Sequence, residues 1–224
     1  MKRLLLLITL LFSGNLFAQT VKTETDQPKL GIKEKFFVLK SDKNIKDGPY
    51  AAYSRYGGKL LYEGFYKNNV RDSIWSSYGY EGELEVKYDY THKKLLAYFP
   101  SKYIADIKTY NVINGADTLN SALDQPPIFV DGDSTLGQLY INNLRYPAEA
   151  RINNVQGKVL IAITVDSSGH IANYRIKKFI GGGCAEEGLR VVKLIRGDWL
   201  PGILNGKPVT SEYILPISFT LSSY

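Results

Sequence analysis

The feature that most restricts the fold is a repeat with a spacing of 25 residues inside the segment 41–100. The string KDGPY at 46–50 corresponds to RDSIW at 71–75, and Tyr53 corresponds to Tyr78. Between these points aromatic side chains alternate with polar ones, which is the period of a strand with one packed face and one wet face. Asp-Gly and Asn-Asn steps separate the runs and favour tight turns. The pattern predicts β-hairpins, each too small to bury its own apolar face, that stack on their neighbours.

These residues resemble the MORN-type repeat, whose signals are Gly-x-Tyr, aromatic-Gly and Gly-Lys/Glu-Leu. The strings GKL at 58–60 and GEL at 82–84 carry the last of these signals, and Ser73 stands where the repeat has Gly. We expect the repeated aromatic side chains to pack between hairpins. Binding of a polymer or a partner along an exposed aromatic edge is the alternative.

Residues 1–18 are predicted to be a cleaved signal peptide. Lys2 and Arg3 precede an apolar run at 4–12, and Ala18 supplies a small residue at the cut. This order is typical of a secretory signal. An uncleaved inner-membrane anchor is the alternative, but a spanning helix needs about 20 mainly apolar residues, and this run is shorter. The mature chain is therefore expected to be exported.

Composition argues against a metal centre and a cofactor. The chain has one cysteine, Cys184, which excludes an intrachain disulfide framework and a thiolate-rich zinc site. Its two histidines are far apart in the sequence, so a histidine metal centre is not expected. The acidic residues Asp124, Asp131 and Asp133 lack the spacing of a calcium-binding loop. We therefore expect neither a metal nor a cofactor.

Charge and nucleophile content argue against nucleic-acid binding and catalysis. The formal net charge of +6 is not gathered in one block, whereas nucleic-acid-binding proteins carry a basic patch or stripe. The one conceivable nucleophile and base pair is Cys184 with His170. A free cysteine is more commonly a buried, inert packing residue. We therefore expect no nucleic-acid partner, no catalytic residue and no enzyme activity.

The last part of the chain mixes helical and strand patterns. Apolar residues recur at helical spacing, or follow helix-start signals, at 133–144, 147–152 and 184–196, and alternating runs lie at 155–165, 170–180 and 209–221. The predicted fold class is α+β, with a C-terminal domain of helices packed on a small antiparallel sheet, preceded by the β-hairpin repeats. The predicted organisation is a signal peptide at 1–18, an N-terminal segment at 19–40, MORN-like repeats at 41–100, a connection at 101–120 and the C-terminal domain at 121–224.

Several strings in this domain resemble the TonB C-terminal domain family, in its Bacteroidota-like form. The strings are LRYPAEA at 144–150, WLPG at 199–202, NGKPV at 205–209 and LPISF at 215–219, and they occur in the family's order. The resemblance implies a periplasmic, non-enzymatic domain. It also implies a partner, a TonB-dependent outer-membrane transporter or a similar envelope protein.

The resemblance further implies that a short extended segment of this partner adds as a strand to the domain's sheet. The final strand follows a turn and can lie at a sheet edge, where unpaired backbone groups accept such a strand. The predicted docking residues are Tyr213, Ile214, Leu215, Pro216, Ile217, Ser218, Phe219 and Thr220. The alternative is that this strand pairs within the domain or with a second copy, giving a homodimer.

Five further family positions are expected to be structural. Tyr146 and Trp199 are predicted to fill the core between the helices and the sheet, because large aromatic residues at the ends of elements usually pack. Pro147 is expected to start a helix, since its fixed φ suits the first helical position. Pro201 and Gly202 are expected to form a turn.

One departure from a full energy transducer shapes the functional prediction. Such a transducer has an inner-membrane anchor and a long Pro-rich spacer, whereas this chain has 9 prolines in all and a predicted cleaved signal. We therefore predict an exported periplasmic adaptor. The alternatives are a membrane-anchored energy transducer, which would contact inner-membrane motor proteins, and an envelope structural or interaction module.

Overall fold

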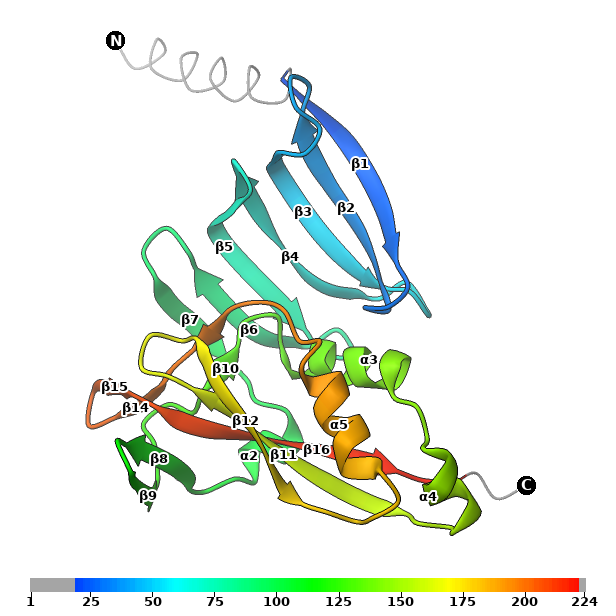
Figure 1. Ribbon diagram of the computed structural model, residues 1–224. Helices are drawn as coiled ribbons and strands as arrows, with labels where there is room; N and C mark the ends of the chain where they lie inside the picture. Colours follow the sequence, from blue (N-terminus) through cyan, green and yellow to red (C-terminus); the bar gives the residue numbers. More distant parts are fainter. Residues whose placement is uncertain (1–18, 222–224) are drawn as a thin grey trace, which may run out of the picture. The chain divides into compact units, whose positions relative to one another are not determined.

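The computed structural model describes residues 19–221, and the chain divides into two compact units at Phe99 and Pro100 (Figure 1). The predicted signal peptide, residues 1–18, lies outside the described residues. Each unit is built around an antiparallel sheet. In the described part, 50% of the residues are in strands and 14% are in helices.

Residues 19–99 form a seven-stranded antiparallel sheet, the N-terminal sheet, whose strands follow one another in sequence order. The strands are β1 (Thr20–Gln27), β2 (Ile32–Leu39), β3 (Lys46–Ser54), β4 (Leu60–Lys67), β5 (Val70–Tyr78), β6 (Leu84–Asp89) and β7 (Lys94–Tyr98). Tight turns make this order possible. Between β4 and β5, Asn68 and Asn69 have φ values of 50° and 65°, and positive φ at both central residues is what a two-residue hairpin turn requires.

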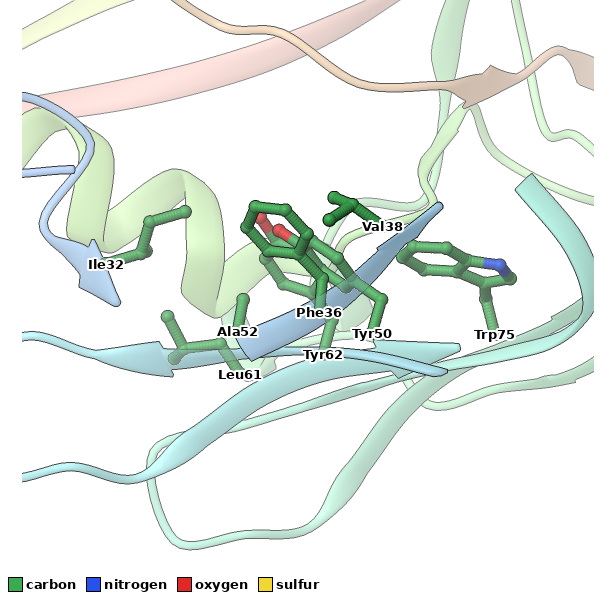
Figure 2. Close-up of a cluster of buried hydrophobic side chains, with 8 residues drawn as sticks. All are labelled: Ile32, Phe36, Val38, Tyr50, Ala52, Leu61, Tyr62 and Trp75. Carbon is green, nitrogen blue, oxygen red and sulfur yellow. The ribbon is translucent and has the colours of Figure 1, made fainter. Parts of the chain in front are cut away.

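One face of the N-terminal sheet carries an apolar cluster, which Figure 2 shows. Its buried members are Ile32, Phe36, Val38, Tyr50, Ala52, Leu61, Tyr62 and Trp75. The ring of Tyr50 lies 5.9 Å from that of Tyr62 and 5.4 Å from that of Trp75. Neighbouring strands thus share one row of aromatic side chains, which is how cross-strand pairs stabilise a sheet.

Residues 100–221 contain a five-stranded antiparallel sheet, the C-terminal sheet, in the order β12-β11-β16-β8-β9. These strands are β8 (Tyr110–Asn114), β9 (Asp117–Ser121), β11 (Gly157–Val165), β12 (Ile171–Lys178) and β16 (Ser211–Phe219). Two small pairs accompany the sheet: β10 (Ile128–Phe129) with β13 (Trp199–Leu200), and β14 (Gly202–Leu204) with β15 (Lys207–Val209). The helices are α2 (Lys102–Ala105), α3 (Asp133–Asn143), α4 (Ala148–Ile152) and α5 (Cys184–Val192).

Helix α5 packs on one face of the C-terminal sheet. A side chain at Gly188 would lie only 3.3 Å from Ile217 and 3.6 Å from Val159, so the helix backbone approaches β16 and β11 closely. Odd-numbered residues of both strands, from Val159 to Val165 and from Tyr213 to Phe219, are buried. They form the core of this unit.

The predicted α+β class is wrong, because the chain is mostly β and its helices are few and short. Residues 184–196 were predicted as one helix, but α5 ends at Val192. The predicted N-terminal segment, 19–40, supplies β1 and β2, and the predicted connection, 101–120, contains α2, β8 and most of β9. Polar residues break the apolar alternation of β1, so its pairing with β2 defines this strand more than its own pattern does.

Replacing Gly64 by Ala should destabilise the N-terminal sheet. A Cβ at this position would lie 2.2 Å from the ring of Trp75, and overpacking of this kind costs roughly 1–3 kcal/mol. We expect a lower midpoint in urea unfolding of the G64A variant. In a Trp75→Leu background the cost of G64A should fall sharply, and an unchanged cost there would contradict the contact as its cause.

Candidate functional site

The predicted docking residues lie on β16, which stands between β11 and β8 in the C-terminal sheet and is therefore not the edge strand that was expected. On one margin, β16 pairs with β11 over its whole length, from Gly157 opposite Phe219 to Val165 opposite Ser211. On the other margin, the described residues supply one pair, Val112 of β8 opposite Ser211. Figure 1 shows β8 beside the beginning of the red strand β16. Most of the second margin of β16 therefore lacks a strand partner within residues 19–221.

Pro216 shows which backbone groups point to which margin. It lies opposite Leu160 of β11, and it has no N–H. A hydrogen-bonded pair would need that N–H, so Pro216 and Leu160 form a non-hydrogen-bonded pair. The flanking residues Leu215 and Ile217 therefore direct their N–H and C=O groups at β11. Even-numbered residues of β16 direct theirs at the other margin.

A hydrogen bond at the start of the strand supports this alternation. The N–H of Ile113 in β8 donates to the carbonyl of Thr210 at 2.9 Å, so an even-numbered residue faces β8. Beyond the contact with β8, three residues face outward: Ile214, Pro216 and Ser218. We call their backbone groups the open margin. It offers three carbonyls but only two N–H donors.

The odd-numbered side chains hold β16 in place. Tyr213, Leu215, Ile217 and Phe219 are all buried. The hydroxyl of Tyr213 donates to Oδ1 of Asp133 at 2.8 Å. Thr220, the last predicted docking residue, follows the end of the strand. The predicted docking segment thus has one fixed, buried side and one open margin.

A buried carboxylate, that of Glu212, lies where the pairing of β8 with β16 ends. The sequence analysis did not predict a role for this residue. Oε2 of Glu212 accepts a hydrogen bond from Nδ2 of Asn111 in β8 at 2.6 Å and lies 3.4 Å from Nζ of Lys177 in β12. Oε1 accepts one from Arg175. Burial raises the pKa of Glu212, but these hydrogen bonds and the two cations outweigh it, so the pKa lies below its ordinary value. A charged residue within an apolar strand was the signal that could have revealed this cluster.

The structure places the five family positions around the core. The hydroxyl of Tyr146 donates to the carbonyl of Val155 at 2.6 Å, and its ring meets that of Phe219 edge-on at 5.6 Å. Pro147 is the N-cap residue of α4, which begins one residue later.

Trp199 and its neighbours pack beneath β16. The Trp199 ring lies 5.1 Å from the rings of Phe129 and Tyr213. Pro201 lies between β13 and β14, and Gly202 begins β14, where a Cβ would lie 2.5 Å from Oγ of Ser211. These contacts hold the first residues of β16 against β13 and β14.

The residues considered for catalysis and metal binding have other contacts. Cys184 is buried, and burial raises the pKa of its thiol, which disfavours the reactive thiolate. His170 lies in an exposed turn, with its ring 2.7 Å from Oγ of Ser168. Within residues 19–221, no group of three His, Cys, Asp or Glu residues is placed to hold a metal ion. Asp133 accepts hydrogen bonds from Tyr213 and from the N–H of Ser101.

The second face of the N-terminal sheet offers another surface. A shallow groove there is lined by aromatic and basic side chains, among them Phe37, Tyr53, Phe65, Tyr78, Lys22, Lys35 and Lys87. Nζ of Lys22 and Lys35 lie 3.4 and 3.7 Å from Oε1 of Glu24, so part of the positive charge is neutralised. No helix in the described part of the chain has the length and apolar character to cross a membrane.

Residues 142–221 match the model of one protein family, described as the Gram-negative bacterial TonB protein C-terminal. The match includes α5, β11, β12 and β16. This family is a non-enzymatic, transport-associated domain that lies in the periplasm. No curated protein and no solved structure matched the chain. The resemblance of residues 41–100 to MORN repeats stays a prediction.

Glu212→Gln should reduce stability at neutral pH. The lost charge-assisted hydrogen bonds are worth roughly 1–3 kcal/mol. Because the folded-state pKa is lowered, the contribution of Glu212 is present above the ordinary glutamate value of about 4.3 and is lost as pH falls through the folded-state pKa. The difference in unfolding free energy between wild type and E212Q should therefore shrink from pH 7 to pH 3. Glu149→Gln, an exposed change, is the control, and a pH-independent difference for E212Q would contradict the charge pairing.

Proposed function

We propose that this protein is a periplasmic adaptor that binds an extended segment of an outer-membrane transporter by strand addition to the open margin of β16. The observation that carries the proposal is the unpaired margin at Ile214, Pro216 and Ser218, inside the region that matches the TonB C-terminal family. The family match supports a part in outer-membrane transport and a place in the periplasm. The adaptor role and the strand addition are our proposal.

The open margin suits a partner of variable sequence. Strand addition obtains affinity from main-chain hydrogen bonds, so it tolerates different side chains in the partner. The strand that the partner would pair with, β16, is also formed in advance, because β11 and the buried side chains already fix it. A preformed strand saves the entropy cost of ordering one side of the interface.

An adaptor differs from an energy transducer in its attachment to the inner membrane. Force from an inner-membrane motor needs a covalent path to the membrane, and the apolar run at 4–12, left uncleaved, is the candidate for that path. These residues lie outside the described part of the chain. We expect mass spectrometry of the protein purified from cells to show an N-terminus near Gln19. A protein that still begins at Met1 or Lys2 and is found in the membrane fraction would favour the anchored transducer.

Peptide binding tests the strand addition directly. A synthetic peptide from the periplasmic segment of a Gram-negative outer-membrane transporter should bind the full mature chain in isothermal titration calorimetry. Two matched peptides would carry backbone N-methyl groups on alternate residues, one on odd and one on even positions. Only one edge of the added strand faces β16, so one methylated peptide should lose affinity about tenfold or more while the other keeps it. Equal affinities of the two would contradict strand addition.

The alternative role, an envelope interaction module, is favoured by the aromatic groove of the N-terminal sheet. The two roles differ in which surface the peptide needs. Under the adaptor proposal, replacing the half-buried Phe65 by Ser should leave peptide affinity unchanged. A loss of peptide binding in a folded F65S variant would contradict the adaptor proposal, because it would place the peptide-binding site in the groove of the N-terminal sheet.

A further inference from the structure

We propose that Pro216 makes the open margin selective for a foreign strand and against a second copy of β16. The part of this inference that concerns the foreign strand rests on the proposed function. The part that concerns the second copy rests on the pairing of β16 alone. Pro216 is the middle one of the three outward-facing residues, and the N–H that it lacks would have pointed at an incoming strand.

Self-pairing about a two-fold axis would place two β16 strands antiparallel. One register uses all three outward positions: Ile214 lies opposite Ser218 of the second copy, and Pro216 lies opposite Pro216 of that copy. In this register the central pair loses both of its hydrogen bonds. Two proline carbonyls would then meet at the centre of the new interface without a donor, and a buried carbonyl without a donor is costly.

A foreign strand without proline meets a smaller penalty. It faces one missing donor instead of two, and it can place its own residues so that a bulge or a strand end falls opposite Pro216. Pairing with Ile214 and Ser218 remains available to it. The difference between a foreign strand and a second copy is therefore at least one backbone hydrogen bond at the centre of the ladder.

The composition of the strand indicates that proline protects this open margin from self-association. Exposed edge strands usually avoid self-association through charged side chains, proline, bulges or coverage by another element. Residues 213–220, YILPISFT, contain no charged side chain. Within the described residues, the cover from β8 ends at the Ser211 pair. Proline is thus the one protective feature that the open margin carries.

Pro216→Val restores the missing donor and tests this inference. In sedimentation equilibrium of the full mature chain, wild type should stay monomeric, and P216V should dimerise about tenfold or more tightly. Ser218→Val is the matched control: it adds the same β-branched side chain on the same face of the strand but changes no backbone donor. S218V should behave as wild type. Dimerisation of wild type through this margin, a monomeric P216V, or equal dimerisation of S218V would each overturn the role of Pro216.

A double variant separates the effect of the missing N–H on dimerisation from any effect of the substitutions on folding. P216V/S218P moves the proline to the next outward position, where its missing N–H again points away from β11, and the protein should return to the monomer. Thermal unfolding of each variant checks that the ladder with β11 is intact. Persistent dimerisation of a folded double variant would contradict the inference. Absence of transporter-peptide binding to wild type would instead contradict the proposed function, so the two failures are distinguishable.

Discussion

The ladder between β11 and β16 is the interaction on which the rest of the C-terminal unit depends. It runs from Gly157 to Val165 without interruption, and it buries the odd-numbered side chains of both strands under α5. Because it fixes the alternation of backbone groups, it also decides which groups of β16 remain for another chain. The register between β11 and β16 thus determines both which side chains are buried in the core and which backbone groups form the open margin.

The extent of the open margin is set by the cluster around Glu212. Its carboxylate joins Asn111 of β8 to Arg175 and Lys177 of β12 across β16. Charge-assisted hydrogen bonds of this kind are stronger than neutral ones. They hold β8 against the first residues of β16, and pairing with β8 ends there. Beyond it, Ile214, Pro216 and Ser218 have no strand partner on this margin within residues 19–221.

Local signals in the sequence were sufficient for some elements and insufficient for others. Turn chemistry predicted the hairpin turn at Asn68 and Asn69, and alternation predicted β16. The fold class was wrong because the described part of the chain is mostly β and its helices are short. A strand such as β1, which is mostly polar, is defined by its partner more than by its own pattern. The Glu212 cluster joins residues up to 101 positions apart, so the sequence marks Glu212 as a charged residue in an apolar strand but does not name its partners. Pro216 was visible as a docking residue, but its consequence depends on the neighbour opposite, Leu160.

Amide hydrogen exchange of β16 followed by NMR tests the central claim most directly. In the free protein, the amides of Leu215 and Ile217 should exchange slowly, because they face β11, and those of Ile214 and Ser218 should exchange fast. With saturating transporter peptide, the amides of Ile214 and Ser218 should also become slow. Slow exchange at Ile214 and Ser218 in the free protein, or no change on adding the peptide, would contradict an open margin that takes a strand.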